Sequence, residues 1–85
     1  MNFRLQPVQV AARSDDQEGQ LVFADGFLAA VLVQLSEQHG ENWGKWFLEA
    51  GFGRAYDYRA PIFADLGEAQ AWIKARLTGT GEGTS

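Results

Sequence analysis

An Asp25-Gly26 pair between two apolar runs constrains the fold of this chain more than any other feature. The first run is Gln20–Ala24 and the second is Phe27–Leu35. A two-residue turn between antiparallel strands needs positive φ at both central positions, which aspartate and glycine tolerate better than most residues. The pattern therefore predicts a β-hairpin in which Phe23 lies opposite Leu28.

Both faces of the second strand of this hairpin are apolar, which indicates a central strand that is covered on both sides. In a register without irregularities, one face carries Leu21, Phe23, Leu28 and Leu32, and the other carries Val22, Val31, Val33 and Leu35. One helix cannot cover both faces. Either the N-terminal segment wraps round the second face, or another subunit covers it.

A helix competes for the same residues. Leu28, Val31, Leu32 and Leu35 recur at helical spacing, and Asp25 and Gly40 could begin and end such a helix. The strand is favoured because the short run 21–23 needs a nearby partner and finds one across the Asp-Gly turn. The valines among these residues also prefer strands.

Two further strands are predicted on either side of the hairpin. Val8–Ala12 can form an edge strand, since Pro7 removes a backbone donor just before it. Lys45–Gly51 alternates, with Trp46, Leu48 and Ala50 on one face. The polar segment 14–19 is predicted to be a loop, and so is the connection 36–44.

The C-terminal segment Leu66–Leu77 predicts an amphipathic helix. Asp65 is a good N-cap, and Glu68 stands at the spacing of a capping box, in which it would bond the N–H of the cap residue. Leu66, Ala69, Ile73 and Leu77 form one apolar stripe. Trp72 flanks this stripe, and Lys74 and Arg76 suit the negative end of the helix dipole.

Together these elements predict one α+β domain over residues 1–77. Its architecture is a small antiparallel β-meander of three to four strands, with the C-terminal helix packed on one face. Residues 78–85 contain glycine, threonine, glutamate and serine with no apolar side chain, so a disordered tail is expected.

Composition excludes several classes of protein. The 85 residues contain no cysteine, so no disulfide framework or zinc-thiolate site can form. The longest apolar run, Phe27–Val33, is far shorter than a membrane span, and no signal-peptide pattern is present at the N-terminus. A cytoplasmic location is therefore expected. The net charge of −4 disfavours binding to nucleic acid or to an anionic membrane.

Catalytic and metal-binding patterns are weak. His39 is the one histidine, and it lies in a polar connection with Ser36 three residues before it and no orienting acid. Glu37, His39 and Glu41 alternate as weak metal ligands would, but a solvated loop has the same composition. The expectation is a protein without catalytic residues, metal or cofactor.

The stretch Arg54–Arg59 is the strongest candidate for binding. Arg54, Tyr56, Tyr58 and Arg59 are of the residue types that dominate binding interfaces. Trp46 is a further candidate, since strand aromatics can stack on a ligand, although they more often belong to the core. The competing interpretation of the stretch is that both tyrosines pack on the sheet while the arginines pair with Asp57.

The leading functional hypothesis is a non-enzymatic protein-interaction domain that is homodimeric through an apolar sheet face or an edge strand. Its basis is the two-sided apolar strand in a thin domain. The alternative is a single-stranded nucleic-acid-binding module that uses the strand and loop aromatics with Arg54 and Arg59.

Overall fold

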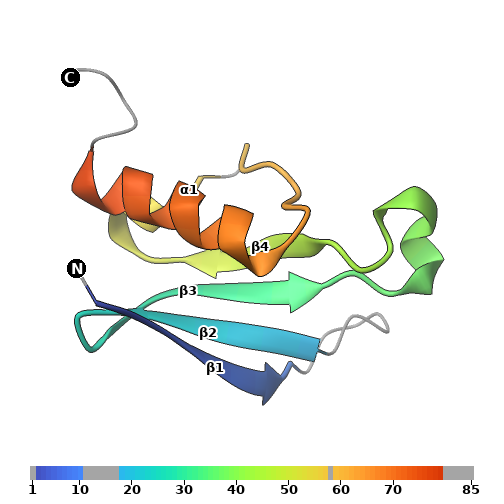
Figure 1. Cartoon of the computed structure of the whole chain (residues 1–85), viewed down its shortest axis with the longest axis horizontal. Helices are drawn as coiled ribbons and strands as arrows, with labels where there is room; N and C mark the ends of the chain where they lie inside the picture. The colour runs from blue at the N-terminus through green and yellow to red at the C-terminus, as the bar shows by residue number, and fades with distance from the viewer. Residues whose placement is uncertain (1, 11–17, 58, 80–85) are drawn as a thin grey trace.

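The structure is a computed structural model that describes residues 2–10, 18–57 and 59–79, without the side chains of residues 38 and 39. The described elements are β1 (Phe3–Gln9), β2 (Glu18–Ala24), β3 (Phe27–Gln34), β4 (Trp46–Gly51), the 3-10 turns η1 (Glu37–Asn42) and η2 (Gly53–Ala55), and α1 (Leu66–Thr78). The strands form one antiparallel sheet in the order β1-β2-β3-β4, and α1 lies along one side of it (Figure 1). The predicted α+β meander with one C-terminal helix is confirmed.

The turn between β2 and β3 is the predicted one. Asp25 and Gly26 have φ values of 52° and 87°. The Asp25 carboxylate accepts a hydrogen bond from the Asn2 N–H at 2.8 Å, and the Asp25 N–H donates to the Asn2 carbonyl at the same distance. The hairpin turn thus also holds the start of β1. Residues 27–34 are a strand, so the competing helix is wrong.

A β-bulge corrects the predicted distribution of apolar residues between the faces. Phe23 pairs with Leu28 as expected, but Val22 pairs with Ala30, which leaves Ala29 as the extra residue. Every later residue of β3 is therefore on the face opposite to the predicted one. Leu32 joins Val22 on the α1 side, and Val31 joins Phe23 on the other.

A second irregularity lies between β3 and β4. Leu32 pairs with Leu48 and Val31 with Ala50, so Glu49 is the extra residue. Trp46 and Leu48 share one face as predicted, but Ala50 does not join them.

The first strand, β1, begins earlier than expected. It runs over Phe3–Gln9, and residues 11 and 12 of the predicted strand lie outside the described residues, as does most of the predicted loop 14–19. Pro7 lies within β1 at the edge of the sheet, which agrees with the rule that confines proline to edge strands.

Both ends of α1 are capped. The Asp65 side chain accepts a hydrogen bond from the Glu68 N–H at 2.8 Å, which confirms the N-cap. The Glu68 carboxylate bonds the N–H of Ala64 and not that of the cap residue itself. Thr78 is the last helical residue and Gly79 the left-handed C-cap, so the predicted tail 78–85 begins within the helix; residues 80–85 lie outside the described part.

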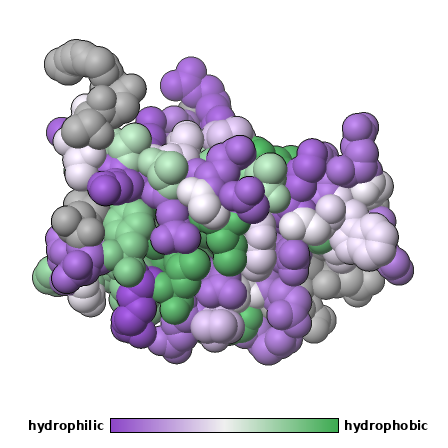
Figure 2. Space-filling view, viewed as in Figure 1, coloured by the Kyte–Doolittle hydropathy of each residue, from purple (hydrophilic) through white to green (hydrophobic). Residues whose placement is uncertain are grey.

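The core lies between the sheet and α1. It contains Val22, Ala30, Leu32, Trp46, Leu48, Ala55, Phe63, Ala69 and Ile73. Phe63 and Trp72 pack with their ring centroids 5.5 Å apart. Phe3 and Leu5 of β1 border this core but are only half-buried. Figure 2 accordingly shows hydrophobic surface between α1 and the lower strands.

Candidate interaction surface

The sheet face opposite α1 is apolar at its centre. The large apolar side chains that the register of β2, β3 and β4 places there are Leu21, Phe23, Leu28, Val31, Val33 and Phe47. None of them belongs to the cluster that packs under α1. Val33 is buried, but Leu28 and Phe47 are 37% and 41% exposed, and the other three are half-buried. Among the described residues, no helix lies across this face.

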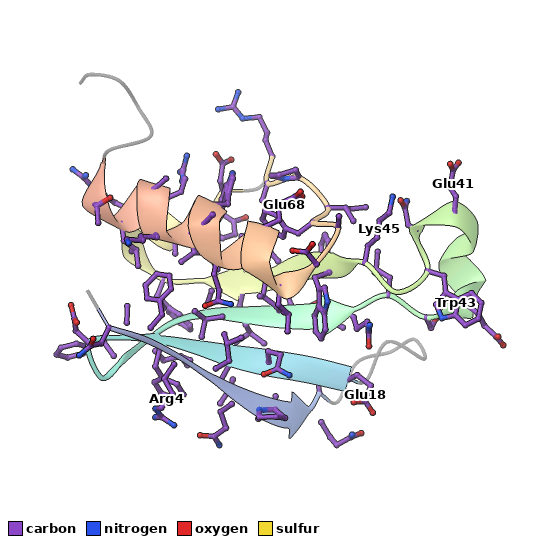
Figure 3. The ribbon with its side chains drawn as sticks, viewed as in Figure 1. Arg4, Glu18, Glu41, Trp43, Lys45 and Glu68 are labelled. Carbon is purple, nitrogen blue, oxygen red and sulfur yellow. The ribbon has the colours of Figure 1, made fainter. Side chains whose placement is uncertain are left out.

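Polar side chains border this apolar centre on β1. Arg4 pairs with Phe23, and its guanidinium carbon lies 4.4 Å from the centre of the Phe23 ring. Gln6 follows at the next position on the same face, within reach of the Arg4 guanidinium. In Figure 3, Arg4 projects from β1 to the side of the sheet away from α1. The apolar centre is therefore bordered by polar side chains at one end of β1, and Val8 lies further along the same face.

The β1 edge of the sheet is protected by Pro7. The Asp25 N–H bonds the Asn2 carbonyl, and bonded positions alternate along an antiparallel pair. Pro7 and its partner Gln20 therefore form an unbonded pair, and the proline nitrogen faces the open edge. A strand added here would meet no donor at this position.

The β4 edge is partly occupied by the chain itself. Trp46 and Phe63 form a β-bridge with two backbone hydrogen bonds of 2.8 Å. At the other end of β4, the turn η2 folds against Gly51 so closely that a Cβ atom there would lie 2.7 Å from the Ala55 oxygen. Both edges are therefore poorly suited to pairing with a strand of a second copy. The sheet face opposite α1 is the better candidate for an interaction surface.

The loop after β4 is fastened to α1 by Arg76. Its guanidinium donates to the Arg54 carbonyl at 3.1 Å and to the Tyr56 carbonyl at 3.5 Å. It also lies 3.3 Å from the Asp57 carboxylate and packs 5.1 Å from the centre of the Trp72 ring. Asp57 in turn accepts a hydrogen bond from the Arg59 N–H at 2.9 Å.

The predicted site residues separate into exposed and buried ones. Arg54 is exposed, Tyr56 is 54% exposed, and the Arg59 side chain is 75% exposed and 3.8 Å from the Asp57 carboxylate. Trp46 is only 9% exposed and belongs to the core. Tyr58 lies outside the described residues. The described loop residues are therefore exposed on one loop, whereas Trp46 lies beneath the surface.

Sequence reasoning missed two features. It related Arg76 only to the helix dipole, because nothing local indicates which carbonyls a helix-terminal arginine will reach. It also gave no indication that the side chains of Phe27 and Phe52 are exposed. Both line a pocket of about 340 Å³ that Leu77 also lines. The position of Phe27 directly after the turn was the available signal for its exposure.

Neither a cluster of metal ligands nor a membrane-spanning helix is present among the described residues. No group of three or more histidine, aspartate or glutamate side chains could hold a metal ion there. No helix in that part is long and apolar enough to cross a bilayer. The chain shows no significant similarity to any protein-family model, curated protein or solved structure with which it was compared.

Proposed function

We propose that this chain is a non-enzymatic protein-interaction domain that forms a homodimer through the sheet face opposite α1. The observation that carries the proposal is the set of apolar side chains, Leu28 and Phe47 among them, on a face across which no described helix lies. Burying such a patch against a second copy removes apolar area from water, which is the main favourable term in protein association.

The geometry of the two edges supports the face over an edge strand. Pro7 interrupts the donors of β1, and the Trp46–Phe63 bridge occupies one end of β4. A face-to-face dimer needs no free backbone groups and leaves both of these features in place. It forms a sandwich of two sheets about 10 Å apart.

The size of the face predicts a weak dimer. Four strands about 4.8 Å apart and six to eight residues long cover on the order of 400 Å² per copy. Stable interfaces bury about 800 Å² per partner. Association is therefore expected at micromolar concentrations or above, and the monomer should dominate below them.

Light scattering after size exclusion, followed by sedimentation equilibrium, tests the proposal. The apparent mass should rise with concentration from 9.4 kDa toward twice that value. A monomer that persists at high micromolar concentration would contradict the homodimer.

The variant Phe47→Glu tests the surface. It places a carboxylate within the proposed interface in both copies, so the dissociation constant should rise by about tenfold or more. Trp43→Glu is the matched control, because Trp43 is 65% exposed and lies in the connection between β3 and β4, outside the strands that form the face (Figure 3). Equal effects of the two variants would assign the dimer to another surface.

A further inference from the structure

The backbone of residues 52–57, which follow β4, packs closely against the rest of the fold although it contains little regular structure. Ala55 is fully buried in the core beneath it. The Ala55 and Tyr56 backbone lies against Gly51, where no side chain would fit. Arg76 of α1 then bonds two of the loop carbonyls and pairs with the Asp57 carboxylate.

None of these contacts uses the side chains of Arg54 or Tyr56. The anchoring groups are backbone carbonyls, a buried alanine and the Asp57 carboxylate. The loop therefore presents Arg54, Tyr56 and Arg59 to solvent on a backbone that is already ordered. Tyrosine and arginine are the side chains most enriched among the residues that dominate binding energy.

We propose that this loop is a docking site for a carboxylate-rich segment of a second protein. The guanidinium groups of Arg54 and Arg59 match the geometry of carboxylates, to which arginine can donate two parallel hydrogen bonds. The Tyr56 hydroxyl adds a donor, and its ring adds apolar contact area.

The charge distribution supports an acidic partner at this loop. The protein as a whole carries a net charge of −4 and repels acidic chains. Within the loop, the one carboxylate, Asp57, is only 18% exposed and lies 3.3 Å from the Arg76 guanidinium and 3.8 Å from that of Arg59. The exposed charges of the loop are therefore the cations Arg54 and Arg59.

The ordered backbone lowers the cost of binding. A flexible loop loses conformational entropy when a partner fixes it, and this loss is subtracted from the affinity. Arg76 has already fixed the carbonyls of Arg54 and Tyr56, so it acts as a positioning residue for the side chains that bind. This site does not depend on self-association.

Fluorescence anisotropy tests the site at protein concentrations where sedimentation shows monomer. The probe is a fluorescein-labelled decapeptide of alternating glutamate and glycine, and the same peptide with lysine is the charge control. The wild type should bind the acidic peptide more weakly as salt rises, and it should not bind the lysine peptide. Absence of binding to the acidic peptide at low salt would overturn the proposal.

The double variant Arg54→Gln/Arg59→Gln should weaken binding of the acidic peptide by about tenfold or more, since it removes both carboxylate partners. Lys45→Gln/Lys74→Gln is the matched control, because it removes two positive charges elsewhere and should change the affinity by less than about threefold. An equal loss in both would indicate nonspecific attraction and overturn the docking site.

Arg76→Lys tests the positioning role with a readout beyond affinity. The variant keeps the positive charge but loses the planar fork that bonds two carbonyls. Peptide affinity should fall while amide exchange of residues 54–57 accelerates.

A thymidine decamer that binds more tightly than the acidic peptide would overturn the proposal in favour of a nucleic-acid ligand. Neither result depends on whether the chain dimerises.

Discussion

At the scale of single residues, Gly51 at the end of β4 shows how tightly the following loop is packed. A Cβ atom at this position would lie 2.7 Å from the Ala55 oxygen and 2.8 Å from the Tyr56 Cα. These are backbone atoms, which cannot rotate away as a side chain can. Gly51→Ala should therefore lower the free energy of unfolding by about 2 kcal/mol, measured by urea titration.

Gly26→Ala is the comparison for this substitution. Gly26 has open space around it, so the cost of an alanine at this position arises only from the φ of +87° that the turn requires. A left-handed conformation costs an alanine about 1 kcal/mol. A Gly51→Ala protein that is more stable than Gly26→Ala would contradict the close packing of the loop.

At the scale of elements, one side chain, Arg76, makes several polar contacts between α1 and the loop. Arg76 is 32% exposed, so its ion pair with Asp57 is screened by solvent, and its hydrogen bonds to two carbonyls contribute most of its effect. Arg76→Ala should lower the free energy of unfolding by about 1–2 kcal/mol. Thermal melts followed by circular dichroism give the comparison.

Lys74→Ala provides the control within the same helix. Lys74 is exposed, and its backbone carbonyl accepts a hydrogen bond from the Thr78 hydroxyl at 2.9 Å. Its replacement should change stability by less than about 0.5 kcal/mol. If both alanine variants melted together with the wild type, Arg76 would not hold the loop.

At the scale of the whole molecule, the strand order predicts an uneven distribution of local stability. β2 and β3 are paired on both sides, whereas β1 and β4 lie at the edges. Buried residues of α1 are limited to Ala69 and Ile73. Hydrogen exchange followed by mass spectrometry should find the slowest amides in β2 and β3 and faster exchange in α1. The reverse order would show that α1, and not the hairpin, forms the most stable unit.

Much of this fold follows from local signals in the sequence. Asp25-Gly26 predicts the turn because its φ values depend on those two residues alone. Asp65 predicts the start of α1 because its side chain reaches an N–H only three residues away. Exposed candidates such as Arg54 and Tyr56 were also identified from residue type and position.

The two bulges could not be predicted in this way. Ala29 and Glu49 look like ordinary strand residues, and each becomes an extra residue only because of how neighbouring strands pair. Since one inserted residue reverses every later side chain, the composition of each face depended on these positions. The burial of Trp46 likewise depends on Phe63 and α1, which are distant in sequence.

The sequence by itself determined the hairpin, the capped helix and the antiparallel meander, because turns, caps and alternation act between residues that are close along the chain. Only the tertiary structure decided which apolar residues α1 covers, which remain open on the opposite face, and that Arg76 fastens the loop of Arg54 and Tyr56. These outcomes depend on packing between elements, where the register with the lowest total free energy is set by all the strands and α1 together.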